Sequence, residues 1–148
     1  GGQIADGCAW YLASFGVPVR VISMAGIFSA DPGIERALHV WHLYGSLDKV
    51  HWLSKVWFPG RWSLAANSAW NRALRDGRAT LHEIGPLAHS GESNYFAGGP
   101  ALADGRAPRD HSVDAIIKIL ASEGLAFDRD PEASTLGVEP DGPAPTGT

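Results

Sequence analysis

Apolar residues recur at helical spacing over the first segment of the chain, which ends at a glycine and a proline. The apolar positions of this segment are Ile4, Cys8, Tyr11, Leu12 and Phe15. Their spacing of four, three, one and three residues places the side chains on one face of a helix. We therefore expect a helix over residues 3–15 with this stripe turned toward the core, stopped by Gly16 and Pro18.

Three shorter runs have the composition of strands. They lie at residues 19–25, 39–46 and 79–85. The first run holds clustered β-branched residues, which is typical of a strand buried on both faces in a parallel sheet. The third run alternates and carries Leu81 and Glu83 on one face, so we expect it nearer to an edge of the sheet.

Helical patterns fill the intervals between these runs. We expect a turn and a short helix over residues 29–38, and a longer helix capped by Ser63. A last helix is expected over residues 111–123, with Asp110 or Ser112 as its cap. The stripes of the two longer helices are Ala66, Ala69, Trp70, Ala73 and Leu74 in one, and Val113, Ile116, Ile117 and Leu120 in the other.

The alternation of helix and strand along the chain predicts an α/β fold. It implies a three-stranded parallel sheet flanked by helices and joined by right-handed crossovers. We expect this domain to span residues 1–127. Residues 128–148 contain four of the ten prolines and almost nothing apolar, so they are expected to form a disordered tail rich in proline and glycine.

Candidate chemistry follows the second and third predicted strands. Asp48 lies in the sequence YGSLDKV, and His89 lies in GPLAHSGESNYF. Ligands of parallel sheets bind beyond the carboxyl ends of the strands, so these two side chains are expected to meet there. A carboxylate in that position accepts a hydrogen bond from the histidine Nδ1–H, which fixes the tautomer and leaves the other ring nitrogen to take a proton.

This order of elements resembles the carboxyl-terminal half of an α/β-hydrolase, from Gly1 to Gly124. In that family the chain order is Ser, then Asp or Glu, then His, and the serine sits in a G-x-S-x-G elbow between a strand and a helix. The opening residues Gly1 and Gly2 fit the last glycine of that elbow and its follower. The resemblance implies that Asp48 and His89 are the acid and the base, and that the serine precedes Gly1.

The resemblance further implies a carboxylic ester hydrolase of the esterase or lipase kind. Its substrate would be a small-molecule or lipid ester, and its partner would be the missing N-terminal half of the same fold. Alone, the chain is expected to be inactive and marginally stable, because the strand at 19–25 would lack its neighbour. Four aromatic residues after Asp48 are candidates to line the substrate pocket: Trp52, Trp57, Phe58 and Trp62.

Composition narrows the range of partners. The 148 residues are 45% hydrophobic and carry a net charge of −4 without a basic run, so nucleic acid is not an expected partner. No apolar run approaches the roughly 18 residues of a membrane span. Cys8 is the only cysteine, which excludes an internal disulfide and a cysteine-rich zinc site. We expect no cofactor and no metal.

Other interpretations of the same residues remain open. The histidines His39, His42 and His51 together with Asp48 suggest a metal site, but His39 and His42 would point to opposite faces of a strand. Ser90 and Ser93 lie near His89 and are possible nucleophiles within this chain, although neither sits in a glycine-framed elbow. The third alternative is a non-catalytic binding or scaffolding domain that keeps a degenerate α/β-hydrolase fold.

Overall fold

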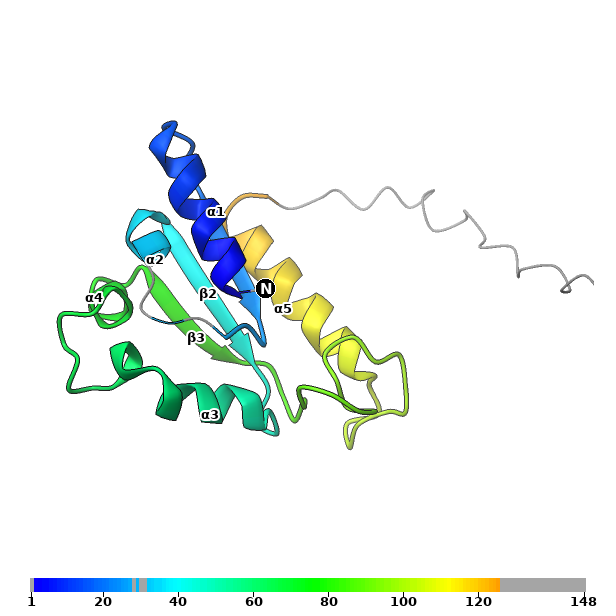
Figure 1. Cartoon of the computed structure of the whole chain (residues 1–148). Helices are drawn as coiled ribbons and strands as arrows, with labels where there is room; N and C mark the ends of the chain where they lie inside the picture. Colours follow the sequence, from blue (N-terminus) through cyan, green and yellow to red (C-terminus); the bar gives the residue numbers. More distant parts are fainter. Residues whose placement is uncertain (1, 28, 30–31, 126–148) are drawn as a thin grey trace, which may run out of the picture.

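The computed structural model describes residues 2–27, 29 and 32–125, and it forms an α/β fold around a three-stranded parallel sheet (Figure 1). The predicted fold class is confirmed. The elements in chain order are α1 (Gly2–Ser14), β1 (Arg20–Met24), α2 (Pro32–Arg36), β2 (His39–Tyr44), α3 (Lys49–Trp57), the 3₁₀ turn η1 (Pro59–Arg61), α4 (Ala69–Arg75), β3 (Ala79–Glu83) and α5 (Pro108–Ser122).

The sheet has the order β1-β2-β3, so β2 is central and β3 is at an edge, as its alternation predicts. Arg20 pairs with His39 at the start of the β1–β2 ladder, and Val40 pairs with Ala79 in the β2–β3 ladder. Because all three strands run in the same direction, their carboxyl ends meet at one edge of the sheet. The loops that follow β2 and β3 are thereby brought together.

Helices cover both faces of the sheet. On one face, α1, α2 and α4 pack on the strands and bury a core centred on Val40, Ile34 and Trp70. On the other face, α5 and the loop after β3 pack on a second core that contains Leu43 and Leu87, both fully buried. Central strand β2 contributes to both cores because successive side chains point to opposite faces.

The face of α1 that packs inward differs from the prediction. The apolar stripe is exposed, with Ile4 72% and Phe15 68% accessible, whereas Asp6 and Ala9 are buried. The reason is the close approach of α2, since a Cβ atom on Gly33 would lie 1.9 Å from the carbonyl oxygen of Asp6. Gly33, which has no side chain, lets α2 lie against the α1 backbone at Asp6, and the face of α1 that carries Asp6 and Ala9 is buried in this contact.

One helix was not predicted, and the predicted caps of two others are corrected. The tryptophan-rich stretch after Asp48 forms helix α3, which the sequence pattern did not indicate. Helix α4 is capped by Ser68, whose side chain accepts a hydrogen bond from the Asn71 N–H, and not by Ser63. The N-cap position of α5 is Ala107, and the Asp110 carboxylate accepts a hydrogen bond from its N–H at 3.2 Å.

The inward face of α5 is also only partly as predicted. Ile116 packs on the second core, whereas Val113 and Ile117 of the predicted stripe are 47% and 42% exposed. Small residues, Ser112 and Ala115, are buried instead. The expected tail at 128–148 lies outside the described residues.

Candidate functional site

The turn that follows β2 is hydrogen-bonded to the loop that follows β3. The backbone N–H of Ser46 donates to the carbonyl of Gly85 at 2.9 Å, and the N–H of Leu47 donates to the carbonyl of Leu87 at 3.2 Å. A Cβ atom on Gly45 would lie 2.1 Å from that Leu87 carbonyl oxygen. A residue without a side chain is therefore needed at position 45 for the two loops to touch.

Asp48 ends this turn and begins α3. It is the N-cap residue, and its Oδ1 accepts hydrogen bonds from the backbone N–H groups of Val50 at 2.9 Å and His51 at 3.0 Å. These two bonds satisfy N–H groups that lack partners within the helix. The cap fixes the side chain of Asp48 so that its second oxygen, Oδ2, points away from α3.

Oδ2 of Asp48 contacts two residues of the loop that follows β3. The hydroxyl of Tyr95 donates to it at 2.7 Å, and Nδ1 of His89 lies 3.3 Å from it. The predicted pairing of Asp48 with His89 is thus present in the geometry. Burial alone would raise the pKa of the fully buried Asp48, but the hydrogen bonds from Tyr95, the His51 backbone and His89 together lower it.

Tyr95 is a site residue that the sequence analysis did not single out. Its hydroxyl oxygen accepts a hydrogen bond from the Gly45 N–H at 2.7 Å while it donates to Asp48. The side chain is 2% exposed, and burial together with the bond to Asp48 raises its pKa. Tyr95 therefore stays protonated and acts as a donor. No spacing rule predicts a contact between residues 47 positions apart, so the sequence held no signal for it.

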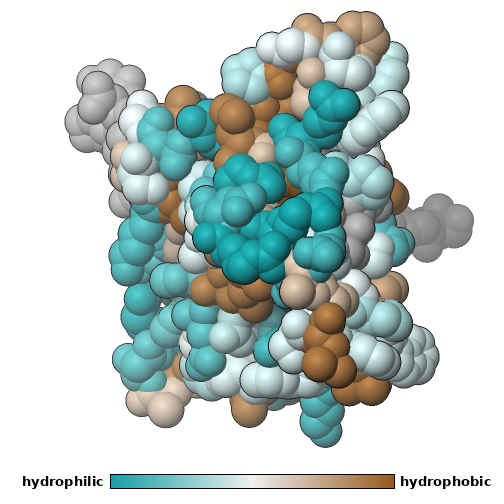
Figure 2. All heavy atoms as spheres, turned by 90° about the vertical axis from the view of Figure 1, so that its left-hand side faces the viewer, coloured by the Kyte–Doolittle hydropathy of each residue, from teal (hydrophilic) through white to brown (hydrophobic). Residues whose placement is uncertain are grey.

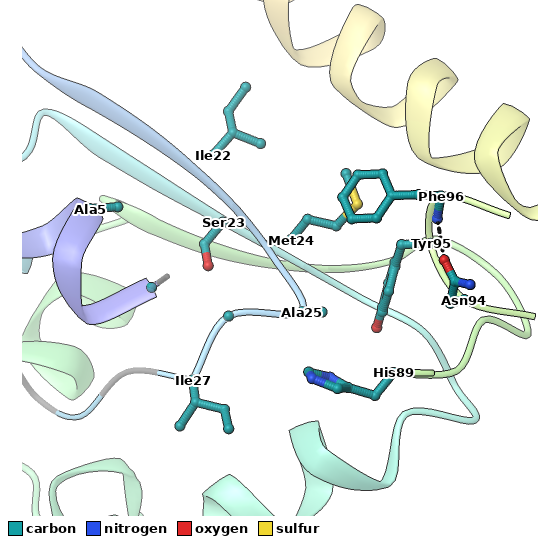
Figure 3. Close-up of a pocket in the computed structure, with 12 residues that line it drawn as sticks. Ala5, Ile22, Ser23, Met24, Ala25, Ile27, His89, Asn94, Tyr95 and Phe96 are labelled. Atoms are coloured by element: carbon teal, nitrogen blue, oxygen red, sulfur yellow. Dashed lines mark hydrogen bonds between the residues drawn. The ribbon is translucent and has the colours of Figure 1, made fainter. Parts of the chain in front are cut away.

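The side chain of His89 lies between Asp48 and the solvent. Its side chain is 42% exposed although its partner carboxylate is fully buried. Because Nδ1 faces Asp48, Nε2 is the ring nitrogen available to a bound group. Figure 3 shows the ring of His89 pointing into a cavity, opposite Ala25 and Ile27 and beside Tyr95.

This cavity has a volume of about 470 Å³. It is lined mainly by apolar side chains from the end of β1 and from the loop after β3, with few polar groups besides His89. The lining includes Ile22, Ser23, Met24, Ala25, Ile27 and Phe96. Such a surface suits an apolar ligand that one or two polar groups hold in place.

The amino end of α1 also borders the cavity, through Gly2. The loop after β1 lies directly against it, since a Cβ atom on Gly26 would meet the Cα of Gly2 at 3.3 Å and the Oγ of Ser23 at 2.1 Å. Ala25, just before, adopts a positive φ of 53°. The start of α1 and the ring of His89 therefore face one cavity. Gly1 lies outside the described residues.

The four aromatic candidates for the substrate pocket do not line this cavity. Trp52 and Trp57 are on α3 and are 49% and 72% exposed. Phe58 forms the carboxyl cap of α3, and Trp62 follows η1 and lines a different cavity. The structure therefore separates these aromatic residues from the Asp48–His89 pair.

The three histidines that suggested a metal site, His39, His42 and His51, do not converge on one point. His39 and His42 lie on opposite faces of β2, as the strand spacing predicts: His39 contacts Thr80 at 2.9 Å, and His42 Nε2 lies 3.0 Å from His51 Nδ1 in the interior. Within residues 2–27, 29 and 32–125, no group of three or more His, Cys, Asp or Glu side chains is placed to hold a metal ion. In the same ranges, no helix has the length and apolar character of a membrane span.

No protein-family model, curated protein or solved structure matches this chain.

Proposed function

We propose that this chain supplies the acid and the base of a Ser–Asp–His triad in a carboxylic ester hydrolase. Asp48 orients His89 through Nδ1, and His89 Nε2 accepts the proton of a serine hydroxyl. The serine oxygen attacks the ester carbonyl, and His89 returns the proton to the departing alcohol. Water, deprotonated by the same nitrogen, then cleaves the acyl-serine bond and releases the acid.

The observation that carries the proposal is the contact between Asp48 Oδ2 and His89 Nδ1 at the mouth of an apolar cavity. Asp48 is fully buried, yet its hydrogen bonds lower its pKa, so a fixed negative charge faces the imidazole. This arrangement favours the imidazolium that forms when the nucleophile loses its proton. A surface ion pair, by contrast, would leave both groups solvated and adjustable.

The serine itself is proposed to lie before α1, outside this sequence. In support, Gly2 at the start of α1 borders the same cavity as His89. A serine two residues before Gly1 is proposed to lie near Nε2, and the amino end of the helix would stabilise an oxyanion formed beside it. Gly1 and Gly2 are then the elbow remnant, in the resemblance to α/β-hydrolases.

The cavity favours an ester with apolar groups on the reacting carbonyl. Ile22, Met24, Ala25 and Ile27 give the lining an aliphatic character, and no acidic or basic side chain other than His89 lines the cavity among the described residues. A charged substrate would lose its hydration there without gaining a partner. We therefore propose neutral esters with short or medium acyl chains, including lipid esters.

The test uses the protein encoded by the longest open reading frame that contains this sequence. Its hydrolysis of p-nitrophenyl butyrate and its labelling by a fluorophosphonate are compared with those of Asp48→Asn and His89→Ala. We expect turnover to fall by about 10³- to 10⁴-fold in both variants, with the label on a serine two residues before Gly1. Matched controls are Asp76→Asn and His82→Ala, which change exposed residues away from the site.

Two outcomes would overturn the proposal. Labelling of Ser90 or Ser93 would place the nucleophile within this chain. Folded protein that neither hydrolyses esters nor takes the label would favour the alternative of a non-catalytic binding domain.

A further inference from the structure

A second cavity, of about 570 Å³, shares no lining residue with the cavity beside His89. It lies among α3, η1, α4 and β3, and it is lined by Lys55, Arg61, Trp62, Leu64, Trp70 and Leu74, among others. Figure 2 views the side of the molecule on which α4 lies in Figure 1, and it shows apolar patches directly beside hydrophilic ones. This cavity combines two cations with aromatic and aliphatic side chains.

Arg61 is the buried cation of this cavity. Its side chain is held by a 3.0 Å hydrogen bond from Nη1 to the Oγ of Ser54, and its guanidinium lies over the ring of Trp70, 4.5 Å from the centroid. The residue is 8% exposed, and burial lowers its pKa to about 10. It is nevertheless charged at neutral pH, and its planar group is fixed in place before any ligand arrives.

Lys55 supplies the second positive charge. Its Nζ lies over the ring of Trp52, 4.0 Å from the centroid. Burial lowers its pKa, and the charge of Arg61 lowers it further, so the two cations repel each other. An anion between them would relieve this repulsion. No acidic side chain lines the cavity among the described residues, so nothing within the lining repels such an anion.

Apart from Ser63 and Asn71, the rest of the lining is apolar, and it is partly open to solvent. Leu64 is 92% exposed and Trp62 is 46% exposed, whereas Trp70 behind them is buried. Leu74 and Leu81 extend the apolar surface. Covering such side chains is favourable by about 25 cal/mol per Å² of apolar area. A small inorganic anion would leave this surface uncovered.

We propose that this cavity binds an amphipathic carboxylate, that is, an organic acid with an alkyl or aryl tail. The carboxylate lies against Lys55 and Arg61, and the tail covers Trp62 and Leu64. Charge-assisted hydrogen bonds to the two cations give the site its preference for an anion. The apolar contacts give the preference for a tail. This site is independent of the proposed ester hydrolysis, because no residue of the Asp48–His89 pair takes part in it.

The test is an NMR titration of the ¹⁵N-labelled chain with octanoate, octanol and inorganic phosphate. We expect octanoate to shift the indole N–H signals of Trp62 and Trp70, and to bind at least tenfold more tightly than either octanol or phosphate. Lys55→Gln should weaken octanoate binding by about tenfold. Leu64→Ser should weaken octanoate binding without changing the response to phosphate.

Lys49→Gln is the matched control, since Lys49 is an exposed lysine on the same helix that does not line the cavity. It should leave octanoate binding unchanged, and circular dichroism should show that all variants keep the wild-type helix content. Equal weakening by Lys49→Gln, equal binding of octanol, or unmoved signals of both tryptophans would overturn the proposal. The comparison of octanoate with octanol and phosphate uses the wild-type protein. It therefore tests the proposed preference for an amphipathic carboxylate even if a variant unfolds.

Discussion

Tyr95 joins Asp48 through a 2.7 Å hydrogen bond that spans 47 residues of sequence. The same hydroxyl accepts the N–H of Gly45 at 2.7 Å. One buried side chain therefore ties the turn after β2 to the loop after β3, and it fixes the carboxylate that faces His89. The position of the site is determined by this contact between loops as much as by the sheet beneath them.

Replacing Tyr95 by phenylalanine should show how much the hydrogen bonds of its hydroxyl contribute to the free energy of unfolding. The variant removes the donor to Asp48 and leaves the Gly45 N–H without its acceptor, both in the interior. We expect Tyr95→Phe to lower the free energy of unfolding by about 1–3 kcal/mol, measured by urea denaturation at pH 7. The control is Tyr11→Phe on the exposed face of α1, which should change it by less than about 0.5 kcal/mol. Equal effects of the two variants would contradict the role given to the hydroxyl.

Gly45 and Gly7 form a matched pair for testing the close approach of the two loops. A Cβ at Gly45 would lie 2.1 Å from the Leu87 carbonyl oxygen, whereas a Cβ at Gly7, within α1, would meet nothing within 4 Å. We expect Gly45→Ala to be destabilising by at least about 1–3 kcal/mol, as for overpacking. Gly7→Ala should stabilise the protein by about 0.5–1 kcal/mol, because alanine favours the helix. In thermal unfolding, the Tm of Gly45→Ala should be lower than that of the wild-type protein, and the Tm of Gly7→Ala should be higher.

The sequence predicted the strands, their parallel arrangement and the pairing of Asp48 with His89. These follow from local composition and from the rule that sites form at the carboxyl ends of parallel strands. Other features could not be predicted. The inward face of α1 depends on its contact with Gly33 of α2, which is a property of packing and not of periodicity. The role of Asp48 as the N-cap of α3 was not predicted, and neither was the helix that it begins.

The exposed stripe of α1 predicts how substitutions there will behave. Ile4 is 72% exposed and Ala9 is 1% exposed, although both belong to the same helix. We expect Ile4→Gln to change the free energy of unfolding by less than about 0.5 kcal/mol and to reduce self-association, because it interrupts an apolar surface. Ala9→Gln, which places the same side chain in the core, should be strongly destabilising. Size-exclusion chromatography and urea denaturation of both variants test whether α1 buries the face that carries Ala9. If α1 buried its apolar stripe instead, Ile4→Gln would be the more destabilising variant.

The buried histidines His42 and His51 predict a loss of stability in mild acid. Their ring nitrogens contact at 3.0 Å, and burial, assisted by the charges of Arg61 and Lys55, lowers the pKa of each below the ordinary value of 6.5. Between the lowered folded pKa and 6.5, the unfolded chain binds protons that the folded chain does not. The free energy of unfolding must therefore fall as the pH decreases below about 6.5, by up to about 1.4 kcal/mol per pH unit for each histidine.

The measurement is the free energy of unfolding between pH 7 and pH 5, where the carboxylate of Asp48 is ionised in both states and contributes no slope. The wild-type protein should lose stability steadily over this interval. His42→Gln is expected to be less stable at pH 7, because it disturbs the buried contact with His51. Its slope with pH should nevertheless be smaller, since one group that titrates only on unfolding has been removed. His82→Gln, at an exposed position of β3, should keep the wild-type slope. If His42→Gln retained the full slope, His42 would have to be protonated in the folded protein, against the direction that its burial imposes.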